Sequence, residues 1–115
     1  MMSNEETMRS KMAEIGARYL ARTVSEIADL EMMVARLPAS GKVALKEIEV
    51  LAHRIRGSGA VFGYAKLSDA AGEIEMLAVS SAATELANAT DLMAQFTAHI
   101  QTLSAETQRA TTQKS

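Results

Sequence analysis

His53 stands in the stretch His53-Arg54-Ile55-Arg56-Gly57, whose residue types suit phosphoryl chemistry. In a helix, side chains lean toward the N-terminus, so that a residue four positions later lies over the one before it. The residue four positions after His53 is Gly57, which has no side chain to cover the imidazole. Arg56, three positions on, can offer positive charge to a phosphoryl group. The pattern therefore predicts an imidazole that is open to an incoming protein and lies beside a cation.

A carboxylate, that of Glu75, is placed to orient this imidazole. Gly63 can end the helix that carries His53, and the next helix would then fold back along it. His53 lies 10 residues before Gly63 and Glu75 lies 12 residues after it, so the two come level in an antiparallel hairpin. Glu75 could then accept a hydrogen bond from Nδ1–H, which would leave Nε2 unprotonated and nucleophilic. The plain alternative is that Glu75 is an ordinary surface carboxylate.

The helix that carries His53 is predicted over residues 42–62. At about 100° per residue, His53 lies about 140° from Ile48 and points away from the apolar stripe. Gly57 and Gly59 lie in mid-helix, where each glycine costs about 1 kcal/mol relative to alanine. Gly59 lies on the stripe, so close packing explains it, whereas Gly57 lies on the outer face, where access for a partner is the better explanation. The stripe consists of Ile48, Leu51, Ala52, Ile55, Gly59 and Phe62.

A first helix is predicted at the start of the chain. Ser3 followed by Glu6 has the spacing of a capping box, and the helical stretch that follows is expected to break or bend near Gly16. Residues 1–16 are thus expected to form a helical extension. Beyond it, apolar residues recur three and four positions apart, which predicts one buried face. These residues are Leu20, Val24, Ile27, Leu30, Val34 and Leu37.

The first helix must stop near Leu37, because Pro38 disfavours helical backbone at the residue before it. Residues 38–41 are then predicted to form a short connection, with Ser40 as the N-cap of the next helix.

Two further helices are predicted downstream. One covers residues 65–78, residues 79–83 form a loop, and residues 108–115 are expected to be a frayed tail. The apolar positions of the helix at 65–78 are Leu67, Ala70, Ala71, Ile74 and Leu77. Those of the last helix are Leu86, Leu92, Met93, Phe96, Ile100 and Leu103.

Length and composition favour an all-α fold. The chain of 115 residues is enough for one domain with one core, and aromatic residues make up only 3% of it. Helix formers such as Ala, Met, Leu and Glu are abundant, while the residues that favour strands are sparse. We therefore predict one domain over residues 1–115, an antiparallel four-helix bundle with an additional N-terminal helical segment.

Several function classes are disfavoured. The net charge of −2 gives no basic excess for nucleic acid. The chain has no cysteine, residues 1–11 lack the apolar stretch of a signal peptide, and no run approaches the ~20 apolar residues of a membrane span. We expect a cytoplasmic protein. His53 and His99 do not have the spacing of a metal site, and no phosphate loop or nucleotide motif is present, so we expect no cofactor.

The segment from Ala52 to Leu77 resembles histidine phosphotransfer (HPt) domains of two-component phosphorelays, and the corresponding domain of chemotaxis kinases. The family pattern has histidine, a basic residue three positions on, glycine four and ten on, an apolar residue fourteen on, and Gln or Glu 22 on. These positions are filled here by His53, Arg56, Gly57, Gly63, Leu67 and Glu75. Arg56 replaces the more usual lysine and keeps the charge. The family fold is a four-helix bundle, in agreement with the pattern of apolar residues.

The resemblance implies a relay that passes a phosphoryl group between receiver-domain aspartates through His53, with Arg56 and Glu75 assisting. The partners would be response-regulator receiver domains and a hybrid histidine kinase, and the magnesium ion would belong to the receiver. Gly57, Gly63, Arg54 and Ser58 are expected to give the partner access. Without a nucleotide site of its own, the chain should be a phosphotransfer intermediate and not an enzyme.

Two alternatives remain open. The chain could be a helical adaptor or inhibitor that binds a kinase or receiver without carrying phosphate, although the joint presence of His53, Gly57 and Glu75 argues against that. It could also be the phospho-accepting domain of a chemotaxis-type kinase, whereas the chain's start and expected frayed end favour a stand-alone protein. We expect a monomer and assign no role to His99.

Overall fold

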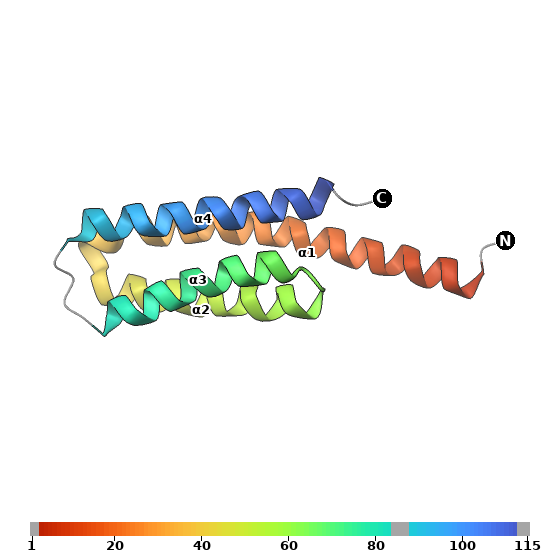
Figure 1. Ribbon diagram of the computed structural model, residues 1–115, viewed down its shortest axis with the longest axis horizontal. Helices are drawn as coiled ribbons and strands as arrows, with labels where there is room; N and C mark the ends of the chain where they lie inside the picture. The colour runs from red at the N-terminus through yellow and green to blue at the C-terminus, as the bar shows by residue number, and fades with distance from the viewer. Residues whose placement is uncertain (1–2, 84–87, 113–115) are drawn as a thin grey trace.

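The computed structural model describes residues 3–83 and 88–112, and all regular secondary structure in these ranges is helical (Figure 1). The four helices are α1 (Asn4–Ala35), α2 (Leu37–Val61), α3 (Ala65–Ala82) and α4 (Ala89–Thr112). Figure 1 shows α1 running beside α4 and α2 beside α3, with consecutive helices antiparallel. The predicted all-α antiparallel four-helix bundle is confirmed.

One face of each helix supplies the core of the bundle. The largest side chains that are almost completely buried include Phe96, Leu30, Leu45, Ile55, Ile74 and Leu103. Each such side chain stabilises the fold by about 1.5–3 kcal/mol relative to an exposed position.

The predicted stripe of α1 was wrong at one position, since Val24 is exposed and its neighbour Thr23 is fully buried. Thr23 lies nearer the centre of the buried face. Its hydroxyl donates to the Tyr19 carbonyl at 3.0 Å, so burial leaves no polar group unsatisfied.

Helix α1 begins as predicted, with the Ser3 hydroxyl accepting from the Glu6 N–H at 3.1 Å. The expected break near Gly16 was wrong, because α1 is continuous from Asn4 to Ala35. Gly16 is buried, and a Cβ there would lie 3.1 Å from the Tyr64 hydroxyl, so this glycine allows a close approach between segments. The N-terminal extension is therefore the first part of α1, and it projects beyond the other helices in Figure 1.

The junction between α1 and α2 is tighter than predicted. Arg36 alone separates the two helices, and it is also the N-cap residue of α2 in place of the expected Ser40. Pro38 lies in the first turn of α2, where a missing N–H is tolerated. The expected connection over residues 38–41 contains a helical turn, and a kink at Gly41, with φ 17° and ψ −96°, separates this turn from the longer helical part of α2 that begins where the sequence predicts.

The turn between α2 and α3 fixes the register of the hairpin. Gly63 has φ +83°, a left-handed conformation that glycine adopts without strain. The Tyr64 N–H donates to the Gly59 carbonyl at 2.8 Å and the Gly63 N–H donates to the Ala60 carbonyl at 3.1 Å. This pair of bonds is the Schellman ending of a helix. Gly63 therefore ends α2 as the sequence predicts.

The later helices are longer than predicted. The expected loop at residues 79–83 was wrong, because nothing in Val79-Ser80-Ser81-Ala82 stops a helix and α3 continues to Ala82. Helix α4 likewise continues to Thr112, since Thr107 is buried and Ala110 packs on the core. The predicted frayed tail was therefore wrong for residues 108–112, and its last three residues lie outside the described part, as does Leu86.

Candidate functional site

The His53 ring lies on the outer face of α2 and meets Glu75 of α3. Its side chain is 63% exposed, whereas the Glu75 side chain is only 17% exposed. His53 Nδ1 and Glu75 Oε2 are 2.8 Å apart, so the contact predicted by counting across Gly63 is confirmed. Because an ionised carboxylate only accepts hydrogen bonds, this contact requires a proton on Nδ1. Nε2 of the neutral ring is then the unprotonated nitrogen.

Arg56 completes a cluster of three side chains. Its Nε lies 2.7 Å from Glu75 Oε1, and its Nη2 lies 3.2 Å from His53 Nδ1. Nδ1 cannot donate to Glu75 and also accept from arginine, and the shorter contact with the carboxylate decides in favour of the Nδ1–H form. Arg56 is therefore held by Glu75 on the Nδ1 side of the ring. The expected contact between Arg56 and a phosphoryl group on Nε2 stays a prediction.

Gly57 leaves the surface beside His53 open. A Cβ built at Gly57 would have no neighbour within 4 Å. Gly59, two positions on, is the opposite case, because its Cβ would lie 3.0 Å from Leu67 Cδ2 and 3.3 Å from Ser68 Cβ. Gly59 therefore permits close packing of α2 on α3, as predicted.

The other residues expected to give access differ in position. Gly63 is ten residues from His53, about 15 Å along a helix, so it shapes the turn and not the surroundings of the ring. The Ser58 hydroxyl donates to the Arg54 carbonyl at 2.8 Å, within α2 itself. Arg54 turns toward α1, where it pairs at 3.6 Å with the nearly buried Glu26. Contact of any of these residues with a partner stays a prediction.

A comparison with protein families adds to this geometry. A family model described as Hpt domain matches residues 17–106. The chain belongs to the Hpt domain family. The match covers His53, Arg56 and Glu75 and begins after the projecting part of α1. No curated protein and no solved structure matches the chain. Family membership places this Hpt domain in histidine phosphotransfer within phosphorelays.

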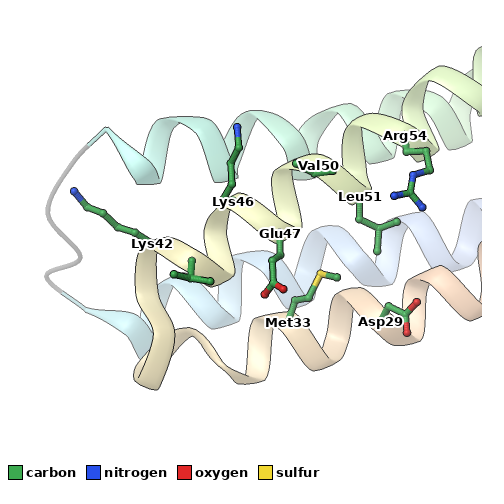
Figure 2. Close-up of a pocket in the computed structure, with 9 residues that line it drawn as sticks. Asp29, Met33, Lys42, Lys46, Glu47, Val50, Leu51 and Arg54 are labelled. Carbon is green, nitrogen blue, oxygen red and sulfur yellow. The ribbon is translucent and has the colours of Figure 1, made fainter.

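A groove between α1 and α2 is lined along α2 from Lys42 to Arg54 (Figure 2). Val50 lies one turn before His53 and is exposed, as is Val43 further along α2. In Figure 2 the Arg54 side chain points from α2 toward α1. The groove thus combines an apolar floor with charged edges. Its lining consists of Asp29, Met33, Lys42, Val43, Lys46, Glu47, Val50, Leu51 and Arg54.

Two residues of α3 that support the site were not predicted. The Ser68 hydroxyl donates to the Arg56 carbonyl at 2.8 Å, and Gly72 lies against the Arg56 side chain. With Glu75 they follow each other at intervals of four and three residues, one face of a helix. This spacing was the available signal. These positions overlap the apolar stripe at 67–77, so the sequence alone does not connect them with Arg56. The packing of α2 on α3 does.

In residues 3–83 and 88–112, no group of three or more His, Cys, Asp or Glu side chains could hold a metal ion. In this part of the Hpt domain, none of the helices combines the length and apolar character needed to cross a membrane. His99 is half-buried on α4, and no role is assigned to it.

Proposed function

We propose that this Hpt domain relays a phosphoryl group between the aspartates of receiver domains through Nε2 of His53. The observation that carries the proposal is the 2.8 Å contact between Glu75 and Nδ1 of a ring that is itself 63% exposed. A tautomer with a free Nε2 and an accessible ring is what a nucleophile for an incoming phospho-protein needs. The open surface over Gly57 supports the same conclusion.

The transfer step neither releases nor takes up a proton. Nε2 attacks the phosphorus of an aspartyl phosphate in line, the N–P bond forms, and the P–O bond to the aspartate carboxylate breaks. The carboxylate leaves as an anion, and the ring becomes a phospho-imidazolium that keeps its proton on Nδ1. The reverse reaction passes the phosphoryl group to a second receiver.

Glu75 faces the positive charge that develops on the ring. Its carboxylate is mostly buried and already in hydrogen-bond contact with Nδ1, so little reorganisation is needed as the charge forms. Arg56 holds the other carboxylate oxygen at 2.7 Å and so fixes the orientation of Glu75. After transfer, Arg56 could also offset charge on the phosphoryl oxygens, which would require it to leave Glu75. The magnesium ion is expected on the receiver.

The receiver domain is proposed to dock on the α1–α2 groove. Val50, which lies one turn before His53 on α2, lines this groove, and together with Val43 it offers exposed apolar surface of the kind that interfaces bury. The cations Lys42, Lys46 and Arg54 lie along its α2 side. A receiver surface that carries the phosphoryl group and acidic residues is anionic, so these cations would favour its approach.

The test uses two matched variants, His53→Gln and His99→Gln. Each would be incubated with phosphoramidate, a small phosphodonor, and with a panel of purified phosphorylated receiver domains. We expect His53→Gln to lose all acid-labile, alkali-stable label and to keep the helical circular dichroism, because an exposed ring can be removed without leaving a cavity. His99→Gln should label normally. Label on His53→Gln would refute the assignment. Receiver binding by an unlabelled wild-type protein would favour the adaptor function instead.

A further inference from the structure

We propose that Gly72 is a positioning residue of the phosphotransfer site, because it makes room for the Arg56 stem that carries the guanidinium to Glu75. The inference rests on the proposed role of His53 as the phosphoryl acceptor. In this arrangement Gly72 acts through Arg56 on Glu75, and Glu75 in turn sets the tautomer of the reactive ring.

Three residues on one face of α3 contact three parts of Arg56. The Ser68 hydroxyl donates to its backbone carbonyl at 2.8 Å, Gly72 lies beneath its aliphatic stem, and Glu75 Oε1 binds its Nε at 2.7 Å. A residue on α2 is therefore held at its backbone, its stem and its charged end by a single stripe of α3.

The backbone gives no reason for glycine at position 72. Gly72 lies inside α3 with helical backbone geometry, where alanine is favoured over glycine. The space around it does give a reason. A Cβ at Gly72 would lie 3.1 Å from Arg56 Cδ and 3.9 Å from Cγ, and among the described residues it would meet no other atom outside its own stretch of α3 within 4 Å. The side chain that excludes a larger residue here is thus that of Arg56.

The position of Arg56 matters because the Glu75 carboxylate has two oxygens with different partners. Oε1 binds Arg56 and Oε2 binds His53 Nδ1, so the bond to arginine fixes the rotation that presents Oε2 to the ring. If Arg56 is displaced, the carboxylate is free to turn, and the preference for the Nδ1–H tautomer weakens. Fewer rings then present an unprotonated Nε2.

The experiment compares Gly72→Ala and Gly72→Leu with Gly16→Ala. Gly16→Ala is the control for Gly72→Ala, since a Cβ at Gly16 also meets a single side chain at 3.1 Å, that of Tyr64, away from His53. Nitrogen NMR of the His53 ring reports the tautomer ratio, and phosphoramidate labelling reports reactivity without any receiver. A melting curve for each variant checks that it is folded.

We expect Gly72→Leu to shift the ratio toward Nε2–H and to slow labelling roughly tenfold, since a displacement of ~1 Å can cost ~100-fold. Gly72→Ala should change both readouts in the same direction by a smaller factor, and Gly16→Ala should change neither. In an Arg56→Ala background, Gly72→Leu should have no further effect, because the residue through which it acts is gone.

An unchanged tautomer ratio and labelling rate in folded Gly72→Leu would overturn the inference. So would a Gly72→Leu effect on the labelling rate that is as large in the Arg56→Ala background as in the wild-type background. Failure of the proposed function is distinguishable, because it appears as label on His53→Gln or as an unlabelled wild-type protein. The tautomer measurement uses the unphosphorylated chain and does not depend on either result.

Discussion

Gly57 and Gly59 lie two residues apart in α2, and the structure predicts opposite consequences when each gains a side chain. A methyl group at Gly57 would meet nothing within 4 Å, so Gly57→Ala should keep the full helix-propensity gain of about 1 kcal/mol. A methyl group at Gly59 would meet Leu67, Ser68 and the Tyr19 hydroxyl at 3.0–3.3 Å. Overpacking of this kind costs about 1–3 kcal/mol, which outweighs the same gain.

The melting temperature should therefore rise for Gly57→Ala and fall for Gly59→Ala, by a few degrees per kcal/mol for a domain of this size. The rate of phosphoryl transfer from a receiver should instead be lowered by a side chain at Gly57 and be unaffected by one at Gly59. A leucine at Gly57 would lean back over His53 and displace the receiver aspartate. Because a misplacement of ~1 Å can cost ~100-fold, transfer to Gly57→Leu should fall by about two orders of magnitude or more. Folded Gly59→Ala should accept phosphate at the normal rate.

The assay measures thermal unfolding and receiver-dependent transfer on the same preparations, with phosphoramidate labelling as a reference for the ring itself. A small donor needs less room than a receiver, so labelling of Gly57→Leu by phosphoramidate should fall far less than transfer. A lower melting temperature together with nearly normal transfer by folded Gly57→Leu would show that Gly57 serves packing. The reasoning from the open surface would then be refuted.

Three further outcomes are expected. Incubation with ATP and magnesium alone should leave the protein unlabelled, and stoichiometric labelling would reveal a kinase activity. Val50→Asp should raise the KM for a phosphorylated receiver about tenfold or more and leave phosphoramidate labelling unchanged. Val24→Asp, at an exposed valine of α1 outside the groove, should change neither quantity. Equal effects of the two variants on the KM would reject the groove as the docking surface. Glu75→Gln should keep the Nδ1–H tautomer through its side-chain carbonyl but slow labelling, while Glu75→Leu should lose the tautomer preference in nitrogen NMR. An unchanged tautomer ratio in Glu75→Leu would contradict the role given to this carboxylate.

The contact between His53 and Glu75 could be predicted because it depends on local signals. The Schellman turn at Gly63 sets the register of the α2–α3 hairpin, and from there the two positions are found by counting along each helix. Exposure of His53 and burial of Gly59 followed from helical periodicity alone. These features need the helix period and one turn, and both are visible in the sequence.

Features that depend on contacts between helices could not be predicted in the same way. Gly16 has the residue type of a helix breaker, yet it lies inside α1 because Tyr64 approaches it from the α2–α3 turn. Thr23 is buried in place of Val24 because its hydroxyl finds a carbonyl one turn back. The reason for glycine at position 72 depends on the Arg56 side chain, which packs across α3 from α2. In each case the partner is distant in sequence or is a specific polar atom, which apolar patterning does not encode.

The glycines of the α2–α3 hairpin show how stability and function are divided in this domain. Gly57, Gly59 and Gly72 each give up about 1 kcal/mol of helix propensity, a substantial loss against the roughly 5–15 kcal/mol that stabilises a typical domain. Only Gly59 recovers that loss through packing, because it lets α2 and α3 come together. Gly72 lies against a charged side chain and Gly57 against nothing, so neither is explained by the core. Both flank the cluster of His53, Arg56 and Glu75, one on each helix. The two glycines whose loss of helix propensity is not recovered by packing therefore lie beside the His53 ring and its partners. That distribution is expected if these glycines serve the proposed phosphotransfer and not the fold.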